Sequence, residues 1–221
     1  MAVRMPLSAV ELRVLGALVE KAFTTPDSYP LSIGALVTAC NQRTSRDPVT
    51  DHHQQEVQEA LARLRDRGLA ATVQEVGDRV PKHHHRLGRA LDLRDEELAV
   101  LSVLMLRGDQ SVGELRTRTE RYVTGLDLAR VETTLGGLAA RRAPLAVNRG
   151  RPPGRSQDRW GHTLGPDEER LQPRARGERA QGTHSEGRAE GAGGTPSFED
   201  RTARLEARVA ALEAVTDPSE T

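Results

Sequence analysis

The histidines of this sequence include two clusters that could ligate a metal ion: His52 with His53, and the run His83, His84 and His85. On an extended strand alternate side chains face the same way, so His83 and His85 could share an ion whereas His84 could not. Zinc sites, however, usually draw their ligands from spaced positions that further hydrogen bonds hold in place. We therefore expect exposed hairpin residues here, with no metal site and no cofactor.

The sequence contains no motif of a known active site. A P-loop, a GxSxG nucleophile motif, a GxGxxG motif after a strand and paired cysteine ligands are all absent from it. Its single cysteine, Cys40, follows Leu36 by four residues in a helical pattern, which indicates burial rather than a reactive thiol. We therefore expect a protein that is not an enzyme.

Side chains suited to nucleic acid are concentrated in one loop and at the start of the helix after it. The loop offers polar and guanidinium groups for phosphate contacts: Asn41, Gln42, Arg43, Thr44 and Arg46. At the start of the helix, Gln54 and Gln55 could read base edges, and His52 could lie near a phosphate. Glu59 and Asp66, further along the same outer face, would repel phosphates.

Further cations stand in two predicted hairpins, where they could contact a phosphate backbone. They are Arg79 and Lys82 in the first hairpin and Arg149, Arg151, Arg155 and Arg159 in the second. Arg46 also has a local interpretation of about equal weight, in which it holds its own loop together beside Asp47 and Pro48.

A third predicted helix in the second half of the chain presents a face of small residues. Opposite its apolar stripe, Val131, Leu135 and Leu138, this face has no basic side chain. Two glycines inside a helix cost about 1 kcal/mol each relative to alanine, so we expect a compensating contact. We predict a protein interface, with the other half of the chain or with a second copy, formed by Thr133, Gly136, Gly137 and Ala140.

Helices are the elements expected to position these groups. Apolar residues make up 36% and aromatic residues 2% of the 221 residues, so Leu, Val and Ala must form the core. Leu and Ala are good helix formers, whereas strands favour β-branched and aromatic residues. The scarcity of aromatic rings also argues against stacking platforms for single-stranded nucleic acid.

The chain repeats itself. The stretch LSAVELRVL at 7–15 matches LRDEELAVL at 93–101, an offset of 86 residues. Each copy begins with an expected capping residue, Ser8 or Asp95, and with carboxylates in the first turn. Both copies then follow helical spacing, which predicts equivalent first helices.

Two later segments match as well. LSIGAL at 31–36 corresponds to QSVGEL at 110–115, with a serine as the expected cap of each helix. Val57, Leu61 and Leu64 recur as Val131, Leu135 and Leu138, again at helical spacing. Gly68 is placed to end the third helix of the first copy.

Strand-like sequence follows each third helix. The predicted strands are 69–76 and 79–87 around Gly77 and Asp78, and 145–148 and 159–164 around a loop rich in Gly and Pro. The order of three helices followed by a hairpin occurs in both copies of the repeat. It predicts a mainly α fold with small β-hairpins. We interpret it as tandem winged-helix domains at 1–90 and 91–165; an all-helical fold leaves the hairpins unexplained.

Several long strings resemble one protein family. They are LVEKAFTTPDSYPLS (18–32), TACNQRTSRDPV (38–49), EVQEALARLRDRGL (56–69), GDRVPK (77–82) and LMLRGDQSVGELRTR (104–118). They are similar to the YceH-like family of uncharacterised bacterial proteins over residues 7 to about 165. The resemblance implies tandem winged-helix domains and carries no catalytic residues with it. The run of three histidines departs from the usual family pattern.

The remaining chain has a different composition. Residues 166–196 contain almost no apolar side chain, which predicts a disordered linker. Within 197–216, Leu205, Val209 and Leu212 fit a short amphipathic, coiled-coil-like helix. A lone helix of this length is marginal in water. A weak self-association or partner helix and a frayed tail are therefore alternatives of equal weight.

Charge is unequal along the chain, although the net charge is zero. Residues 1–165 contain 24 Lys and Arg against 20 Asp and Glu, and residues 166–221 contain 8 against 12. A mild basic excess permits phosphate binding without requiring it. The longest apolar stretch, 98–106, is about half the ~20 residues of a membrane span, and the N-terminus has no long apolar segment of the signal-peptide kind. We therefore expect a cytoplasmic protein without a membrane partner.

The leading hypothesis is a protein that binds double-stranded DNA. A transcriptional regulator is the role that we consider for it. In it the first copy contacts DNA, and the second copy mediates packing or assembly. The alternative is a non-enzymatic adaptor that docks a protein partner, or a second copy in a homodimer, on its winged-helix surfaces. The DNA hypothesis depends mainly on analogy between folds, which is a weak warrant.

Overall fold

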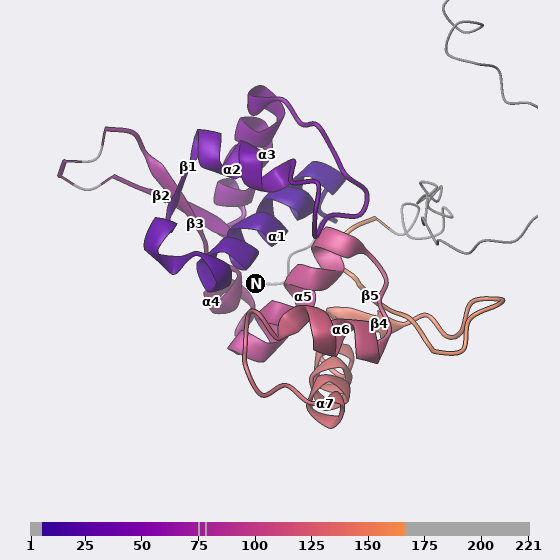
Figure 1. Ribbon diagram of the computed structural model, residues 1–221. Coiled ribbons are helices and arrows are strands. Elements are labelled where there is room, and N and C mark those ends of the chain that lie inside the picture. Colours follow the sequence, from indigo (N-terminus) through magenta and orange to yellow (C-terminus); the bar gives the residue numbers. More distant parts are fainter. Residues whose placement is uncertain (1–5, 75, 78, 167–221) are drawn as a thin grey trace, which may run out of the picture. The chain divides into compact units, whose positions relative to one another are not determined.

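The computed structural model of the chain describes residues 6–74, 76–77 and 79–166 (Figure 1). Residues 1–174 group into one compact unit, so both copies of the repeat lie within it. The terminal helix predicted at 197–216, with its interface residues Leu205, Val209 and Leu212, lies outside the described residues, as does the predicted linker apart from Pro166. The domain division after residue 90 stays a prediction.

The fold is mainly helical with small antiparallel sheets, as predicted. The first copy contains α1 (Ala9–Thr24), the 3-10 helix η1 (Pro26–Ser28), β1 (Leu31–Ser32), α2 (Ile33–Cys40), α3 (Gln54–Asp66), β2 (Ala70–Val73) and β3 (Lys82–His85). The short α4 (Leu87–Leu91) leads to the second copy. That copy contains α5 (Asp95–Arg107), α6 (Val112–Thr119), α7 (Leu128–Ala139), β4 (Ala146–Asn148) and β5 (Trp160–His162). Among the described residues, no helix has the length and hydropathy needed to cross a membrane.

Both predicted hairpins are confirmed. In the first copy β3 lies between β1 and β2, with Leu31 opposite His83. In the second copy β4 pairs with β5, and Gln110 forms an isolated antiparallel bridge with Trp160. The backbone N–H groups of Gln110 and Trp160 each donate to the other's carbonyl oxygen, at 2.9 and 2.7 Å. In the second copy this bridge lies at the position that corresponds to the pairing of β1 with β3 in the first copy.

Serine caps begin three of the helices. The N–H of Ser8 donates to Glu11 Oε2 at 2.7 Å, and Ser8 Oγ accepts from the Glu11 N–H, which completes a capping box for α1. Ser32 and Ser111 cap α2 and α6 through their side chains. Gly68, with a φ of +71°, follows the end of α3 in a conformation that glycine adopts without strain.

One predicted cap is wrong. The N-cap of α5 is Arg94, and Asp95 is the first residue inside the helix. The Arg94 N–H donates to Glu97 Oε2 at 2.9 Å, so a carboxylate from the first turn does bind the N-cap backbone. A single-residue shift of this kind arises because a flanking carboxylate and a true cap look alike in sequence.

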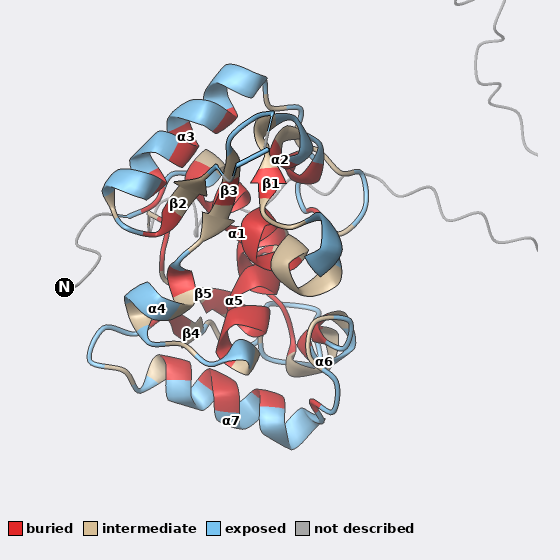
Figure 2. Cartoon of the chain, turned by 90° about the vertical axis from the view of Figure 1, so that its left-hand side faces the viewer, coloured by how far each residue is buried: buried red, intermediate tan, exposed pale blue. Residues whose placement is uncertain are grey.

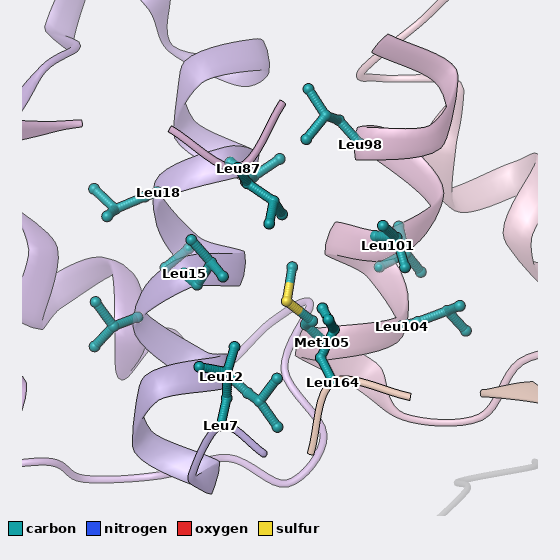
Figure 3. Packing of buried hydrophobic residues seen from close by; sticks show 14 of the residues in the cluster. Leu7, Leu12, Leu15, Leu18, Leu87, Leu98, Leu101, Leu104, Met105 and Leu164 are labelled. Carbon is teal, nitrogen blue, oxygen red and sulfur yellow. The ribbon is translucent and has the colours of Figure 1, made fainter. Parts of the chain in front are cut away.

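Helices α1 and α5 pack along each other and join the two copies. Leu12, Leu15, Leu101 and Met105 belong to one buried cluster, in which Leu12 and Met105 lie between the two helices (Figure 3). The approach is close at Gly16, where a Cβ would lie 2.9 Å from Leu106 Cγ. Glycine at this position therefore lets the two helices meet.

A matched pair of ion contacts holds each third helix to the start of its first helix. Glu11 and Glu97 are equivalent positions of the repeat, and both are buried. Arg67 Nη2 lies 3.7 Å from Glu11 Oε1, and Arg141 Nη2 lies 3.3 Å from Glu97 Oε1. Arg67 and Arg141 occupy corresponding positions just after α3 and α7, so the two copies use the same anchor.

The third helices bury the predicted stripes, which are Val57, Leu61 and Leu64 in α3 and Val131, Leu135 and Leu138 in α7. Their opposite faces are exposed (Figure 2). The two helices lie at opposite ends of the described fold (Figures 1 and 2).

Candidate functional site

Arg46 lies inside the protein rather than on a nucleic-acid surface. Its side chain is 0% exposed, and its Nη2 lies 2.5 Å from Glu20 Oε2. Nε and Nη2 donate to the Ala39 carbonyl at 3.0 and 2.6 Å, and Nη2 also donates to Gln42 Oε1. A guanidinium enclosed in this way has no surface for a phosphate, so the prediction that Arg46 contacts nucleic acid is wrong. Its local interpretation agrees with the structure, with Glu20 as the ion-pair partner.

Glu20 connects the two copies through a polar cluster, defined as Glu20, Arg46, Arg121 and Tyr122, in which Glu20 and Arg46 are buried and Arg121 is exposed. Arg121 Nη2 pairs with Glu20 Oε1, and the Tyr122 hydroxyl lies 3.2 Å from the same oxygen. Burial acts to raise the pKa of Glu20, but the hydrogen bond and charge of Arg46, helped by Arg121, hold that pKa below its usual value. Glu20 was not among the residues predicted from the sequence. Its spacing of eight from Leu12, which places a carboxylate on the apolar stripe of α1, was the available signal.

The other predicted residues of the loop after α2 divide into structural and exposed ones. Asn41 Nδ2 donates to the His52 carbonyl, and Asn41 Oδ1 accepts from the His52 N–H, both at 2.9 Å. Asn41 therefore ties the two ends of the loop together, while Gln42 is bound to Arg46. Arg43 and Thr44 are exposed.

The start of α3 is open to solvent. Gln54 and Gln55 are both exposed, and the Gln55 amide donates to Glu59 Oε1 at 3.0 Å. His52, just before the helix, is half-buried. The amide groups predicted to read bases are thus accessible.

A cleft of about 980 Å³ lies between the loop before α3 and the loop between β4 and β5. Arginines contribute much of its lining, and they are Arg13, Arg107, Arg149, Arg151, Arg155 and Arg159. The carboxylate residues in the lining are Asp47 and Asp109, and His52 also lines it. The fold therefore brings the second-hairpin arginines next to the start of α3, which the sequence analysis did not foresee.

The two central helices position the wall of this cleft. Arg13 of α1 donates from Nη2 to the Pro48 carbonyl at 2.5 Å. The Asp47 N–H donates to the carbonyl of Leu106, in α5, at 2.9 Å. Both contacts hold the loop before α3 against α1 and α5, so the cleft belongs to the packed interface between the copies.

The cleft arginines differ in how far acidic neighbours already neutralise them. Arg149 Nε lies 3.1 Å from Asp109 Oδ2, and Arg159 pairs with Glu114. Arg151 is 63% exposed, and its Nε lies 3.9 Å from Asp158 Oδ1, a distant surface pair of little energetic weight. Among the described residues, none forms a hydrogen bond or ion pair with the guanidinium of Arg155, which is exposed. Arg151 and Arg155 are therefore the most available cations.

Arg107, one of the residues that line the cleft, has charged neighbours outside the lining. Burial lowers the pKa of Arg107, and the charges of Arg118 and Arg121 lower it further. A group in this position is stabilised by a nearby anion. The negative charge of Glu20 is one such anion, and it acts against the lowering of the Arg107 pKa.

The first-hairpin cations do not join this cleft. Arg79 is exposed and Lys82 half-buried, and the β2–β3 loop projects to the opposite side of the fold from the β4–β5 loop (Figure 1). The predicted nucleic-acid residues are consequently split, with His52, Arg149 and Arg151 at the cleft and Arg79 and Lys82 far from it.

The small-residue face of α7 is not covered by any of the residues that the structure describes. Thr133, Gly136, Gly137 and Ala140 are all exposed, and a Cβ on either glycine would meet no atom within 4 Å among the described residues. The expectation that this face packs on the other half of the chain is therefore wrong. Packing on a second copy stays a prediction.

The histidine run belongs to β3. His83 Nδ1 lies 3.0 Å from Thr72 Oγ1, and the His85 N–H donates to the Tyr29 hydroxyl at 2.7 Å. Burial lowers the pKa of His85 to about 4, with a smaller contribution from His84. In the part of the chain that the structure describes, no group of three or more His, Cys, Asp or Glu side chains is arranged to hold a metal ion.

Comparison with known proteins places the chain in a family. Residues 7–155 match the family model described as "Protein of unknown function, DUF480". A UPF0502 protein of Geobacter sulfurreducens is 46% identical over 172 residues, which cover 76% of this chain and 78% of the relative. A UPF0502 protein of Azoarcus sp. is 43% identical over 211 residues, which cover 96% of this chain and 91% of the relative. The resemblance noted from the sequence is confirmed at the level of the family: the chain belongs to the DUF480, or UPF0502, family of uncharacterised bacterial proteins.

Proposed function

We propose that this protein binds double-stranded DNA, with its arginine-lined cleft on the phosphate backbone. The observation that carries the proposal is the convergence of six arginines, against two aspartates, on one cleft beside the exposed start of α3. Phosphate contacts supply much of the affinity of DNA-binding proteins, and arginine matches phosphate oxygens with paired donors.

The topology supports a DNA-binding fold. Each copy consists of three helices and a hairpin, and a short strand or bridge before the second helix joins that hairpin. This is the order of a winged helix, in which the third helix usually enters the major groove and the hairpin loop contacts the backbone. We therefore propose that both copies are winged helices.

The start of α3 is the proposed reading element. Gln54 and Gln55 are exposed there, and glutamine side chains can bond adenine in the major groove. Glu59 and Asp66 lie further along the exposed face and would repel phosphates, so only the N-terminal turns of α3 are suited to approach DNA.

This arrangement changes the roles that we propose for the two copies of the repeat in DNA binding. The sequence hypothesis had the first copy contact DNA and the second mediate packing or assembly, with Arg149 and Arg151 as additional phosphate contacts. The cleft takes Arg149, Arg151, Arg155 and Arg159 from the second copy. We propose that the first copy reads bases and the second supplies most phosphate contacts.

A protein-docking role is the second candidate function. It is favoured by the outer face of α7, which is uncovered in this chain and where Gly136 and Gly137 leave room for another backbone. The two roles use different surfaces, so variants can separate them.

The test of DNA binding is a fluorescence-polarisation titration of the full chain against a mixed-sequence duplex at low salt. Arg151→Ala with Arg155→Ala should weaken binding roughly tenfold, the effect of about 0.7 kcal/mol for each partly solvated contact. The matched control, Arg89→Ala with Arg142→Ala, removes the same charge from exposed sites outside the cleft and should leave affinity unchanged. Absence of binding by the wild-type chain would contradict the proposal and favour the docking role.

A further inference from the structure

The described chain ends at the edge of the arginine-lined cleft. Gly165 and Pro166 are part of the cleft lining, and the next three residues in the sequence are Asp167, Glu168 and Glu169. We propose that this acidic run is an internal ligand of the cleft, which competes with DNA phosphates for Arg151 and Arg155. The inference rests on the proposed function, because it describes how the same site is regulated.

The point from which the acidic run departs is held firmly. The Leu7 N–H donates to the Leu164 carbonyl at 2.7 Å, and both leucines are buried. A Cβ on Gly165 would lie 2.9 Å from Leu12 Cδ1, so the backbone passes close against α1 at this position. Pro166 therefore leaves from a defined place on the cleft wall.

Covalent reach keeps the three carboxylates near the cleft. A chain advances at most about 3.6 Å per residue, so the Cα of Glu169 lies within about 11 Å of the Cα of Pro166, whatever direction the chain takes. This is comparable to the distance over which charges interact at physiological salt, about 8 Å. Peptide geometry thus limits how far these three negative charges can be from Pro166, which lines the cleft.

The chemistry of the cleft suits a carboxylate as well as a phosphate. Arginine pairs with both groups through the same donors, and the cleft already contains such a pair between Arg149 and Asp109. Within the described part of the chain, the ion contact of Arg151 is the distant one with Asp158, which leaves donors for a further carboxylate. Arg155, exposed in the same loop, can do so too. An acidic segment tethered at the rim has a high effective concentration, which makes a weak contact effective.

The experiment measures the reactivity of the arginines in the full chain without DNA. Phenylglyoxal modifies accessible guanidinium groups, and peptide mass spectrometry gives the rate at each arginine. The variant Asp167→Asn, Glu168→Gln, Glu169→Gln should raise the rates at Arg151 and Arg155 several-fold and leave Arg89, an exposed residue outside the cleft, unchanged. Its matched control neutralises three later carboxylates, by Glu178→Gln, Glu186→Gln and Glu190→Gln.

Two results would overturn the proposal: rates at Arg151 and Arg155 that stay at the wild-type value, or rates that rise as much in the control variant. In the DNA titration, the variant neutralised at 167–169 should bind several-fold more tightly than wild type, and the control variant should not. If neither chain binds DNA, the proposed function fails, and the reactivity measurement still decides whether the acidic run occupies the cleft.

Discussion

The hydroxyl of Ser102 donates a hydrogen bond to the carbonyl oxygen of Gly16 at 3.1 Å, and the two residues are 86 positions apart. The same number separates the matching stretches that begin the two copies of the repeat, so Gly16 and Ser102 are equivalent positions. Equivalent residues meet when two copies of a unit pack through the same face about a two-fold axis. The contact between α1 and α5 therefore has the character of a dimer interface within one chain.

Gly16 should not tolerate a side chain. Gly16→Ala would place its Cβ 2.9 Å from Leu106 Cγ, and we expect a loss of about 1–3 kcal/mol in the free energy of unfolding from overpacking. Gly136→Ala is the matched control, because it lies in a helix with no atom within 4 Å of its new Cβ, and it should stabilise by up to about 1 kcal/mol. Urea denaturation measures both. Equal effects of the two substitutions would show that α1 and α5 do not approach closely.

The buried ion pair of Glu20 with Arg46 should contribute strongly to stability. Glu20→Gln leaves the enclosed guanidinium of Arg46 without its counter-charge, and we expect a loss of roughly 3 kcal/mol at pH 7. Glu59→Gln, at an exposed site 3.9 Å from Arg63, should change stability by less than about 0.5 kcal/mol. Thermal and urea denaturation report the difference, and equal stability of the two variants would refute this role for Glu20.

The stabilising effect of Glu20 should depend on pH in a defined direction. Its pKa in the folded protein is below its usual value of 4.5, so the stabilisation it provides is fully present above pH 4.5 and is lost as the pH falls through the lower folded pKa. The difference in the free energy of unfolding between wild type and Glu20→Gln should therefore be constant from pH 7 to pH 5. It should become smaller below pH 4.5. A difference that became smaller already between pH 7 and pH 5 would contradict the lowered pKa.

His85 should stay neutral at mildly acidic pH. Burial lowers its pKa in the folded protein to about 4, whereas an unfolded chain protonates histidine near 6.5. Between these values only the unfolded chain takes up the proton at this residue, so its contribution to stability falls as the pH is lowered from 6.5 towards 4. NMR titration of the imidazole checks this, with the urea-unfolded chain as the reference. Titration of His85 near 6.5 in the folded protein would show that the ring is solvated.

Local features of the fold were predictable from sequence because neighbouring residues determine them. The caps at Ser8, Ser32 and Ser111 follow from serine before a helical stripe, and both hairpins follow from strand-like residues around a turn. The ion contacts of Glu11 with Arg67 and of Glu97 with Arg141 could also have been predicted. The repeat aligns the two glutamates with each other and the two arginines with each other.

The candidate site was less predictable because it depends on how the two copies pack. Nothing near Arg46 in the sequence reveals that Glu20 encloses it, and nothing near Arg151 reveals that the loop before α3 lies across the cleft. The first of these contacts joins residues 26 positions apart within the first copy. The second arises from the contact of α1 with α5, which brings segments about a hundred residues apart together. The uncovered face of α7 has the same origin, because the copies pack through their first helices and leave that face outside.

The central claim is that Arg151 and Arg155 contact DNA phosphates. The slope of the logarithm of the binding constant against the logarithm of salt concentration tests it most directly, because each phosphate contact contributes about 0.9 to that slope. For Arg151→Ala with Arg155→Ala the slope should be smaller in magnitude by about 1.8, whereas Arg79→Ala should leave it at the wild-type value. A wild-type slope in the double variant would contradict the account.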